Sequence, residues 1–400
     1  MKRIYDPVHH FIELELAEAR LLDTPALQRL RRLRQLGLAY LAFPSAEHSR
    51  FSHALGALAM GTRAFDELLR HGARFFSDQE DIDYQRRLLR AALILHDVGH
   101  GPFSHACEAV LGVRHEDRTR AILALPAIQA HLADLDVDSQ HVAGLILGGE
   151  PQFPVLTELV SGPNLDADRM DYLQRDAYFT GVAGGKYDAD QLLGSLRIFD
   201  VAGRPVLGIE RRGVVALESF LLARYMMFAS VYFHHTTRMF ERILQQALSE
   251  LWPDPRALDP IDEFLRWDDF RVLNELRDSE SVPASALRER VRLYALAAEF
   301  NAEHDLRAFE RCEKALRKAF GDAVWADEQS QLMHRLPLQA DPKSPTIWVS
   351  NSSGSLVDAR EASDLIAKLS GKAHWRKLFV ERARVDVAEA RRICRETTNG

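Results

Sequence analysis

The chain has 400 residues, of which 46% are hydrophobic and 27% are charged, and its formal net charge is −7. This composition is typical of a globular protein with a large core, so it excludes a disordered chain. We expect no membrane-spanning segment, because no uncharged apolar run approaches about 20 residues. The acidic balance argues against a nucleic-acid coat protein, so nucleic-acid binding is allowed but not indicated. The N-terminus lacks an apolar signal core, and we predict a cytoplasmic protein.

Helical periodicity dominates the chain from about residue 24 to about residue 325. One interruption is RIFDVAGRPVLGIE (197–210), where alternating apolar residues on both sides of Gly203 predict a β-hairpin. We therefore expect a mainly α protein with a helical domain over residues 1–330.

The sequence changes character after about residue 330, where prolines cluster. PTIWVSN (345–351) and KLFVERARVDV (377–387) are expected to be strands on either side of a helix in REASDLIAKLS (360–370). We predict that residues 331–400 form a small α/β lobe.

The three cysteines, Cys107, Cys312 and Cys394, are widely separated and show no CxxC spacing. Neither a disulfide framework nor a zinc–thiolate site is indicated. We expect them to be unpaired core or surface thiols.

The run LILHDVGHGPFSH (93–105) gives the first chemical signal, because His96 and Asp97 directly follow an apolar helix. An imidazole and a carboxylate side by side suit Mn, Fe, Ni or Zn, or Mg if water fills more of the shell. A helix C-terminus that turns at Gly99 explains the same pair without a metal. The pair alone leaves both interpretations open.

A second candidate surface lies on the helix expected in NLDADRMDYLQRDAYFTG (164–181), which begins at Asn164 or Asp166 as its cap. One face of this helix carries polar side chains at helical spacing, namely Asp168, Asp171, Tyr172, Arg175 and Asp176. A solvated helix surface shows the same pattern.

Arg224 is flanked by Leu, Met, Phe and Val in the long helix of LLARYMMFASVYFHH (221–235). A buried guanidinium costs several kcal/mol unless an anion pairs with it. The anion could be Asp171 or Asp176, or it could be a bound phosphate, which a planar guanidinium can bind at two oxygens. Tyr232 falls on the same face of this helix.

Histidines also cluster at His100, His105 and His115, with Glu108 one turn after His105. Histidine titrates near neutral pH, and a neighbouring carboxylate fixes its tautomer and raises its basicity. This combination suits acid–base chemistry on phosphoesters.

The order H…HD…D, here His53, His96 with Asp97, and Asp168, resembles that of the HD-domain metal phosphohydrolases. Longer blocks resemble the deoxynucleoside triphosphate triphosphohydrolases related to the SAM-and-HD-domain protein and the bacterial dGTPase group. These blocks are IYDPVHHFIELE, LLDTPALQRLRRLRQLG, FPSAEHSRFSHALG, HDVGHGPFSH and DADRMDYLQRDAYFTG. The resemblance covers about residues 1–250. It implies a helical HD core in which those four side chains hold one divalent metal, and it allows a second Mg with the nucleotide.

The resemblance also implies roles for the remaining polar residues. His115 and Glu108 would form the acid–base pair, and His100 would assist them near the triphosphate. The substrate would contact Arg50, His105, Arg169 and Arg224 at its phosphates, Tyr172, Asp176 and Tyr232 around the deoxyribose, and Gln35 and Leu36 at the sugar edge. Three positions depart from the family pattern: Glu108 replaces an Asp, Arg169 replaces a Lys, and Phe233 stands where relatives can carry Gln.

Regulated members of the family are tetramers with nucleotide effectors at subunit junctions. Lys2, Asp23, Arg31 and Gln35 match positions that bind a guanine nucleotide there, whereas Tyr5 replaces an Asn. The resemblance thus implies a homo-oligomer, dimer or tetramer, that can take a nucleotide effector.

The sequence therefore predicts metal-dependent hydrolysis of dNTPs to the deoxynucleoside and inorganic triphosphate. Two alternatives stay open at this point. One is an HD-type phosphatase or phosphodiesterase acting on another nucleotide. The other is a nucleotide-sensing or nucleic-acid-binding protein with residual catalysis.

Overall fold

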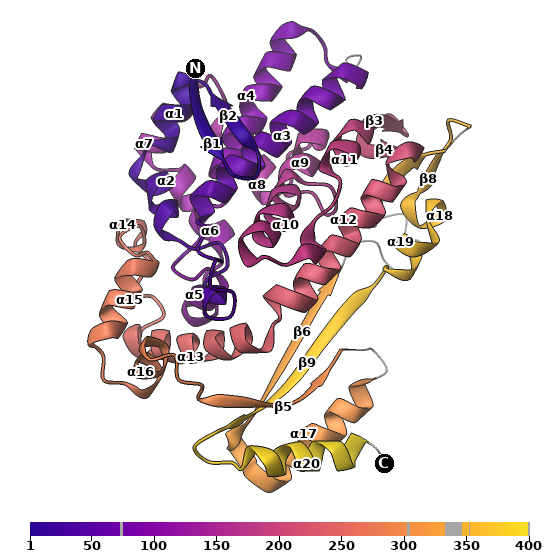
Figure 1. Cartoon of the computed structure of the whole chain (residues 1–400). Coiled ribbons are helices and arrows are strands. Elements are labelled where there is room, and N and C mark those ends of the chain that lie inside the picture. The colour runs from indigo at the N-terminus through magenta and orange to yellow at the C-terminus, as the bar shows by residue number, and fades with distance from the viewer. Residues whose placement is uncertain (73–74, 302–304, 333–345, 352, 399–400) are drawn as a thin grey trace.

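The structure is a computed structural model that describes residues 1–72, 75–301, 305–332, 346–351 and 353–398 (Figure 1). Most of these residues are helical, which confirms the predicted mainly α fold. The chain begins with an antiparallel hairpin that we had not predicted, made of β1 (Lys2–Asp6) and β2 (His10–Leu14).

Three helices at the centre of the helical body carry the polar motifs. The long helices α3 (Arg50–Gly72) and α4 (Gln79–Leu95) pack on each other, and α10 (Ala167–Thr180) packs on α3. Their apolar faces form one continuous core, as the helical period predicts. Around them lie α1 (Leu16–Leu22), α2 (Pro25–Arg29), α5 (His105–Leu111), α6 (His115–Leu123), α7 (Pro126–Asp134), α8 (Ser139–Leu147), α9 (Pro154–Ser161) and α11 (Ala189–Ser195).

The next helix, α12 (Val214–Met227), continues into a π-helical turn, η6 (Phe228–Tyr232). The helical stretch of residues 211–232 is long and apolar enough to cross a membrane by length and composition, but 56% of its apolar 18-residue window is buried inside the protein. Packing against α10 and α11 accounts for its apolar character. The helical body is completed by α13 (His235–Leu251), α14 (Ile261–Phe264), α15 (Asp269–Asp278) and α16 (Val282–Arg288).

The predicted hairpin is confirmed as β3 (Leu196–Val201) paired with β4 (Arg204–Glu210). β4 also pairs in parallel with β7 (Trp348–Ser350), which pairs antiparallel with β8 (Leu356–Asp358). The strand predicted in PTIWVSN therefore forms, but it extends the hairpin sheet rather than the sheet of the C-terminal lobe. The helix predicted after it is split into α18 (Ala359–Ala362) and α19 (Asp364–Lys368).

The C-terminal lobe is a three-stranded antiparallel sheet covered by two helices, α17 (Leu306–Phe320) and α20 (Val387–Thr398) (Figure 1). Its strands are β5 (Tyr294–Phe300), β6 (Val324–Leu332) and, between them, β9 (Lys372–Glu381). The expectation of helix through residue 325 was wrong at β5, because pairing with β9 fixes this alanine-rich segment as a strand. The boundary at residue 330 falls inside β6, and the division into two domains stays a prediction.

The expectation of three unpaired cysteines was also wrong. Cys312 on α17 and Cys394 on α20 form a disulfide, with their Cα atoms 5.2 Å apart, whereas Cys107 is a buried free thiol. The sequence separation of 82 between the paired cysteines hides the relationship in the sequence, because only the packing of α17 on α20 brings them together.

Candidate metal and phosphate site

Three predicted metal ligands meet where α3, α10 and the end of α4 come together. Nε2 of His53 lies 2.9 Å from Oδ1 of Asp168 and 3.2 Å from Nε2 of His96. One donor atom from each of these residues lies within 4.8 Å of the others. Two atoms that each bind one cation at about 2.0–2.2 Å are separated by about 3 Å, so the donors fit a divalent ion.

Asp97, the fourth predicted ligand, lies beside this group and has further partners. Its Oδ1 is 3.6 Å from Nε2 of His96, and its Oδ2 is 3.8 Å from Nε2 of His53. The same carboxylate pairs with Nη1 of Arg50 and lies 3.2 Å from Nε2 of His100. Asp97 thus connects the predicted metal site to the residues predicted to bind phosphate.

The turn after Asp97 places two histidines in contact. His100 stacks on His115, with ring centroids 4.0 Å apart. Gly99 makes this possible, because a Cβ there would overlap the backbone of His115 and the side chain of Thr119 at the start of α6. Nδ1 of His115 is 2.9 Å from Oε1 of Glu108, the predicted partner.

Hydrogen bonds and burial shift the pKa values of the two stacked histidines in opposite directions. Burial alone would lower the pKa of His115, but the hydrogen bond to Glu108 raises it above the usual value. Burial and the charge of Arg50 lower the pKa of His100 well below that value. Burial would raise the pKa of Glu108, yet hydrogen bonds from His105 and His115 hold it well below normal. His115 is therefore suited to donate a proton, while His100 is neutral.

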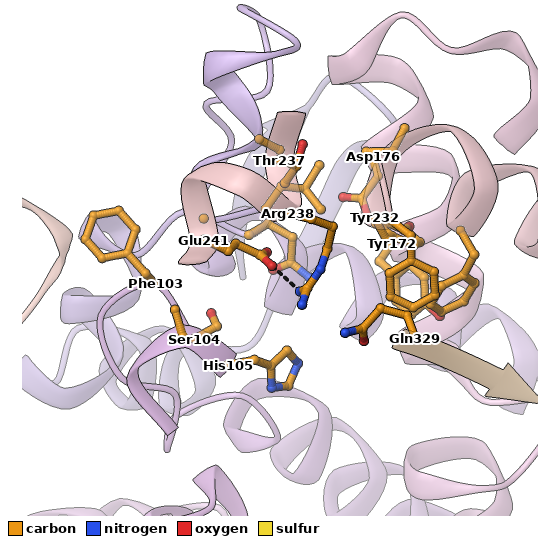
Figure 2. Close-up of a pocket in the computed structure, with 18 of the residues that line it drawn as sticks. Phe103, Ser104, His105, Tyr172, Asp176, Tyr232, Thr237, Arg238, Glu241 and Gln329 are labelled. Atoms are coloured by element: carbon orange, nitrogen blue, oxygen red, sulfur yellow. Dashed lines mark hydrogen bonds and ion pairs between the residues drawn. The ribbon is translucent and has the colours of Figure 1, made fainter. Parts of the chain in front are cut away.

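The backbone is strained between these histidines, since Phe103 and Ser104 both have φ of 53°. Such conformations cost about 1–3 kcal/mol per residue and need support from their surroundings. The N–H of Phe103 donates to buried Asp269 at 2.8 Å, and Oγ of Ser104 accepts Nε and Nη2 of Arg50 at 2.9 and 2.7 Å. This support fixes the loop from which His105 projects (Figure 2).

A cavity of about 510 Å³ opens beside this loop (Figure 2). Seven residues that we predicted to contact substrate line it: Gln35, Leu36, Arg50, His105, Tyr172, Asp176 and Tyr232. Asp176 organises one wall, because its carboxylate accepts the hydroxyl of Tyr232 at 2.7 Å and lies 2.8 Å from Nε2 of His48. The rings of Tyr172 and Tyr232 meet edge to face at 6.1 Å.

Two predicted phosphate ligands are not among the residues that line this cavity. Arg169 pairs with Asp166, its helix cap, and donates to the carbonyl oxygen of Gly162 at 2.7 Å. Arg224 is buried near Tyr172 and Tyr232, and its charge acts on both phenols. Within the described ranges Arg224 has no ion pair, and its Nε is buried without a hydrogen-bond partner.

A charged group that was not predicted from the sequence lies on the opposite wall of the cavity. Arg238 on α13 pairs with Glu241 and makes two hydrogen bonds, 2.9 and 2.8 Å long, to the carboxylate of Asp327 on β6. Gln329, two residues further along β6, also faces the cavity (Figure 2). Arg238 and Glu241 are spaced like any solvated pair on an amphipathic helix, so no local signal distinguishes them.

Of the residues matched to an effector site, Lys2, Asp23 and Arg31 are exposed, whereas Gln35 lines the cavity. Nζ of Lys2 lies 3.9 Å from Oδ2 of Asp23, and both side chains are more than half exposed. The guanidinium of Arg31 lies 3.6 Å from the ring centroid of Phe51. The effector role of these residues stays a prediction.

Comparisons with known proteins agree with this geometry. A family model described as "HD associated region" matches residues 187–378. The chain is 39% identical over 405 residues to the Bacillus subtilis protein YwfO, across 92% of this chain and 89% of YwfO. A solved phosphohydrolase from Bacteroides thetaiotaomicron, BT4208, superposes with a TM-score of 0.74 at 27% identity, across 95% of this chain and 100% of that one.

A more distant relative is named for its activity. The deoxynucleoside triphosphate triphosphohydrolase SAMHD1 of Danio rerio is 27% identical over 287 residues, across 63% of this chain and 45% of that protein. Together, the extended match to YwfO, the HD-associated region and the His–Asp cluster show that the chain belongs to the HD-domain phosphohydrolases.

Proposed function

We propose that the protein hydrolyses deoxynucleoside triphosphates to the deoxynucleoside and inorganic triphosphate with the help of a divalent metal. The observation that carries the proposal is the pairing of Asp97, beside the His–Asp cluster, with Arg50 in the cavity wall. A metal held by His53, His96, Asp97 and Asp168 would polarise the phosphate and activate water. The distant likeness to SAMHD1 supports the choice of substrate.

The reaction breaks the bond between the α-phosphorus and O5′, adds a water oxygen to phosphorus, and needs a proton on O5′. His115 is suited to supply this proton, because its contact with Glu108 raises its pKa. Arg50 lies at the cavity wall with His105 beside it, and the positive charge of Arg50 would stabilise the negative charge of the triphosphate while O5′ leaves.

Tyr172 and Tyr232 support a preference for deoxyribose. Their rings pack against each other, and Asp176 fixes the hydroxyl of Tyr232. A tyrosine packed under the sugar would clash with a 2′-hydroxyl, so ribonucleotides would be excluded.

The test is incubation of the full chain with each canonical nucleotide and Mn²⁺ or Mg²⁺, followed by chromatography of the products. We expect a deoxynucleoside and intact triphosphate, and loss of both in the double variant His96→Ala, Asp97→Ala. His71→Ala, at the C-terminal end of α3 and away from the cavity, is the control and should keep full activity.

Product identity also separates the alternatives. Orthophosphate or a nucleoside monophosphate would replace the proposal with a phosphatase or phosphodiesterase. Binding of nucleotides without turnover under any metal would indicate a sensing protein.

We also propose that the chain forms a homo-oligomer with a nucleotide effector, supported by Lys2, Asp23, Arg31 and Gln35. Added GTP or dGTP should then accelerate hydrolysis of dATP, and Lys2→Ala should abolish the acceleration without changing the basal rate. Light scattering should show a dimer or tetramer.

A further inference from the structure

One buried carboxylate, that of Asp171, connects the N-terminal hairpin to the predicted metal site. Asp171 lies on α10, three residues after Asp168, and is fully buried. Its Oδ2 is 2.7 Å from Nδ1 of His53 on one side. Its Oδ1 is 2.5 Å from Nε2 of His9, which lies between β1 and β2. The side chain of His9 is 4% exposed, so solvent does not screen this contact.

The contact with Asp171 determines which nitrogen of His53 can bind a metal. A carboxylate only accepts hydrogen bonds, so Nδ1 donates to Asp171 and Nε2 is the nitrogen left to bind a cation. Nε2 is the atom that faces Asp168 and His96. Carboxylates that hold metal-binding histidines in this way set both ring orientation and ligand basicity.

Asp171 is itself held from two directions. Arg175, on the same helix, donates Nε to Oδ2 at 2.9 Å and Nη2 to Oδ1 at 3.0 Å. His9 approaches Asp171 from the hairpin. Among the hydrogen bonds of the described residues, it is the contact that reaches Asp171 from outside α3 and α10. Removal of His9 would free Oδ1 on one side and let the carboxylate rotate away from His53.

The hairpin turn is rigid enough to act as a support. Oδ1 of Asp6 accepts the backbone N–H groups of Val8 and His9, each at 2.9 Å. Oδ2 of Asp6 accepts Nη1 of Arg175 at 2.8 Å. The backbone of His9 is therefore fixed relative to the helix that carries Asp171.

We propose that His9 is a positioning residue for the metal site, which holds Asp171 in the orientation that presents Nε2 of His53 to a divalent cation. The competing explanation is that His9 only anchors the hairpin. The two differ in what they predict for metal affinity, because the hairpin has other anchors, such as Arg90 on α4, whose Nη2 donates to the carbonyl oxygen of Glu13 at 2.9 Å.

The experiment is a calorimetric titration of the metal-stripped full chain with Mn²⁺, without nucleotide. His9→Ala should raise the dissociation constant about tenfold or more, as is typical of residues that support metal ligands. His9→Gln, whose amide can donate to Oδ1 of Asp171, should recover most of the affinity. The controls are His10→Ala, the exposed neighbour, and Arg3→Ala, which weakens the hairpin without touching Asp171. The Mn²⁺ dissociation constants of both control variants should stay within twofold of the wild-type value.

Mn²⁺ affinity that is unchanged in His9→Ala while the melting temperature falls would overturn the proposal in favour of simple anchoring. An equal loss of affinity in Arg3→Ala would also overturn it. If the alanine variant does not fold, His9→Gln and His9→Asn make the same comparison, since the shorter amide cannot reach Asp171. The titration contains no nucleotide. Failure to hydrolyse dNTPs would therefore contradict the proposed function without affecting the conclusion about His9 and Mn²⁺ affinity.

Discussion

Gly56 on α3 faces Asp171 on α10, and a Cβ at position 56 would overlap Oδ1 of that carboxylate. Gly56 comes three residues after His53, one turn further along the same helix. Glycine inside a helix costs about 1 kcal/mol relative to alanine. The close approach explains the glycine, because it lets Asp171 reach between His53 and Arg175.

Gly56→Ala is expected to disrupt the support of His53 although alanine is the better helix former. The methyl group would displace Asp171, so we expect Mn²⁺ affinity to fall about tenfold or more and stability to fall by about 1–3 kcal/mol. Titration calorimetry and thermal unfolding measure the two effects. Gly194→Ala is the control, because a Cβ there meets open space. If Gly56→Ala binds Mn²⁺ with the wild-type affinity, the close approach of Gly56 and Asp171 is not needed for metal binding.

Arg224→Met tests whether the buried guanidinium of Arg224 serves an internal ion pair or binds a phosphate of the substrate. Since the described residues provide no anion for Arg224, removal of its charge should leave the melting temperature unchanged or higher. If it binds phosphate, the KM for a dNTP should rise about ten- to hundredfold, which corresponds to a charge-assisted hydrogen bond. Arg175→Met is the matched comparison, because Arg175 pairs with Asp6 and Asp171 and should be needed for stability. A comparable loss of stability in both variants would reject the phosphate role.

Glu108→Gln should move the alkaline limb of the pH–rate profile to lower pH. The carboxylate raises the pKa of His115, so its removal lets His115 lose its proton earlier as pH rises. We expect kcat/KM to decline about one pH unit sooner, the usual effect of a nearby opposite charge. Glu116→Gln, whose carboxylate lies 3.6 Å from the same nitrogen, should shift the limb less. An alkaline limb that stays in place would show that His115 is not the proton donor.

Glu158→Gln should stabilise the protein in a pH-dependent way. Burial raises the pKa of Glu158 from 4.5 to about 7, so the folded state resists its ionisation. The destabilisation is absent below pH 4.5, grows between the unfolded and folded pKa values, and is complete above pH 7. We therefore expect the variant to gain about 1–3 kcal/mol at pH 8 and almost nothing at pH 4.5. Thermal unfolding at the two pH values is the measurement, with exposed Glu280→Gln as control. An equal gain at both pH values would contradict this account.

The sequence predicts those parts of the site that depend on local pattern. His53, His96 and Asp168 each lie on or beside a periodic helix, and the order of the motifs indicates the family before any distance is known. Asp166 caps its helix as the pattern suggested, with its side chain accepting the N–H of Arg169. Helix caps and helical faces are determined within a few residues, which is why they can be read from the sequence.

What escaped prediction depends on contacts between distant segments. The roles of His9 and Asp171 exist only because the hairpin packs against α10. Arg238 is a pocket residue only because β6 brings Asp327 to it. The hydrophobic period describes single elements and contains no information about which elements meet, so these residues resemble ordinary surface polar groups.

Through strand β6, the C-terminal lobe contributes residues to the wall of the cavity. Asp327 fixes Arg238, and Gln329 and Ser330 on the same strand form part of the wall. This part of the cavity wall therefore comes from late in the chain, whereas the His–Asp cluster comes from its first half. Substitutions in this one strand would reshape the cavity wall and leave the residues of the His–Asp cluster untouched.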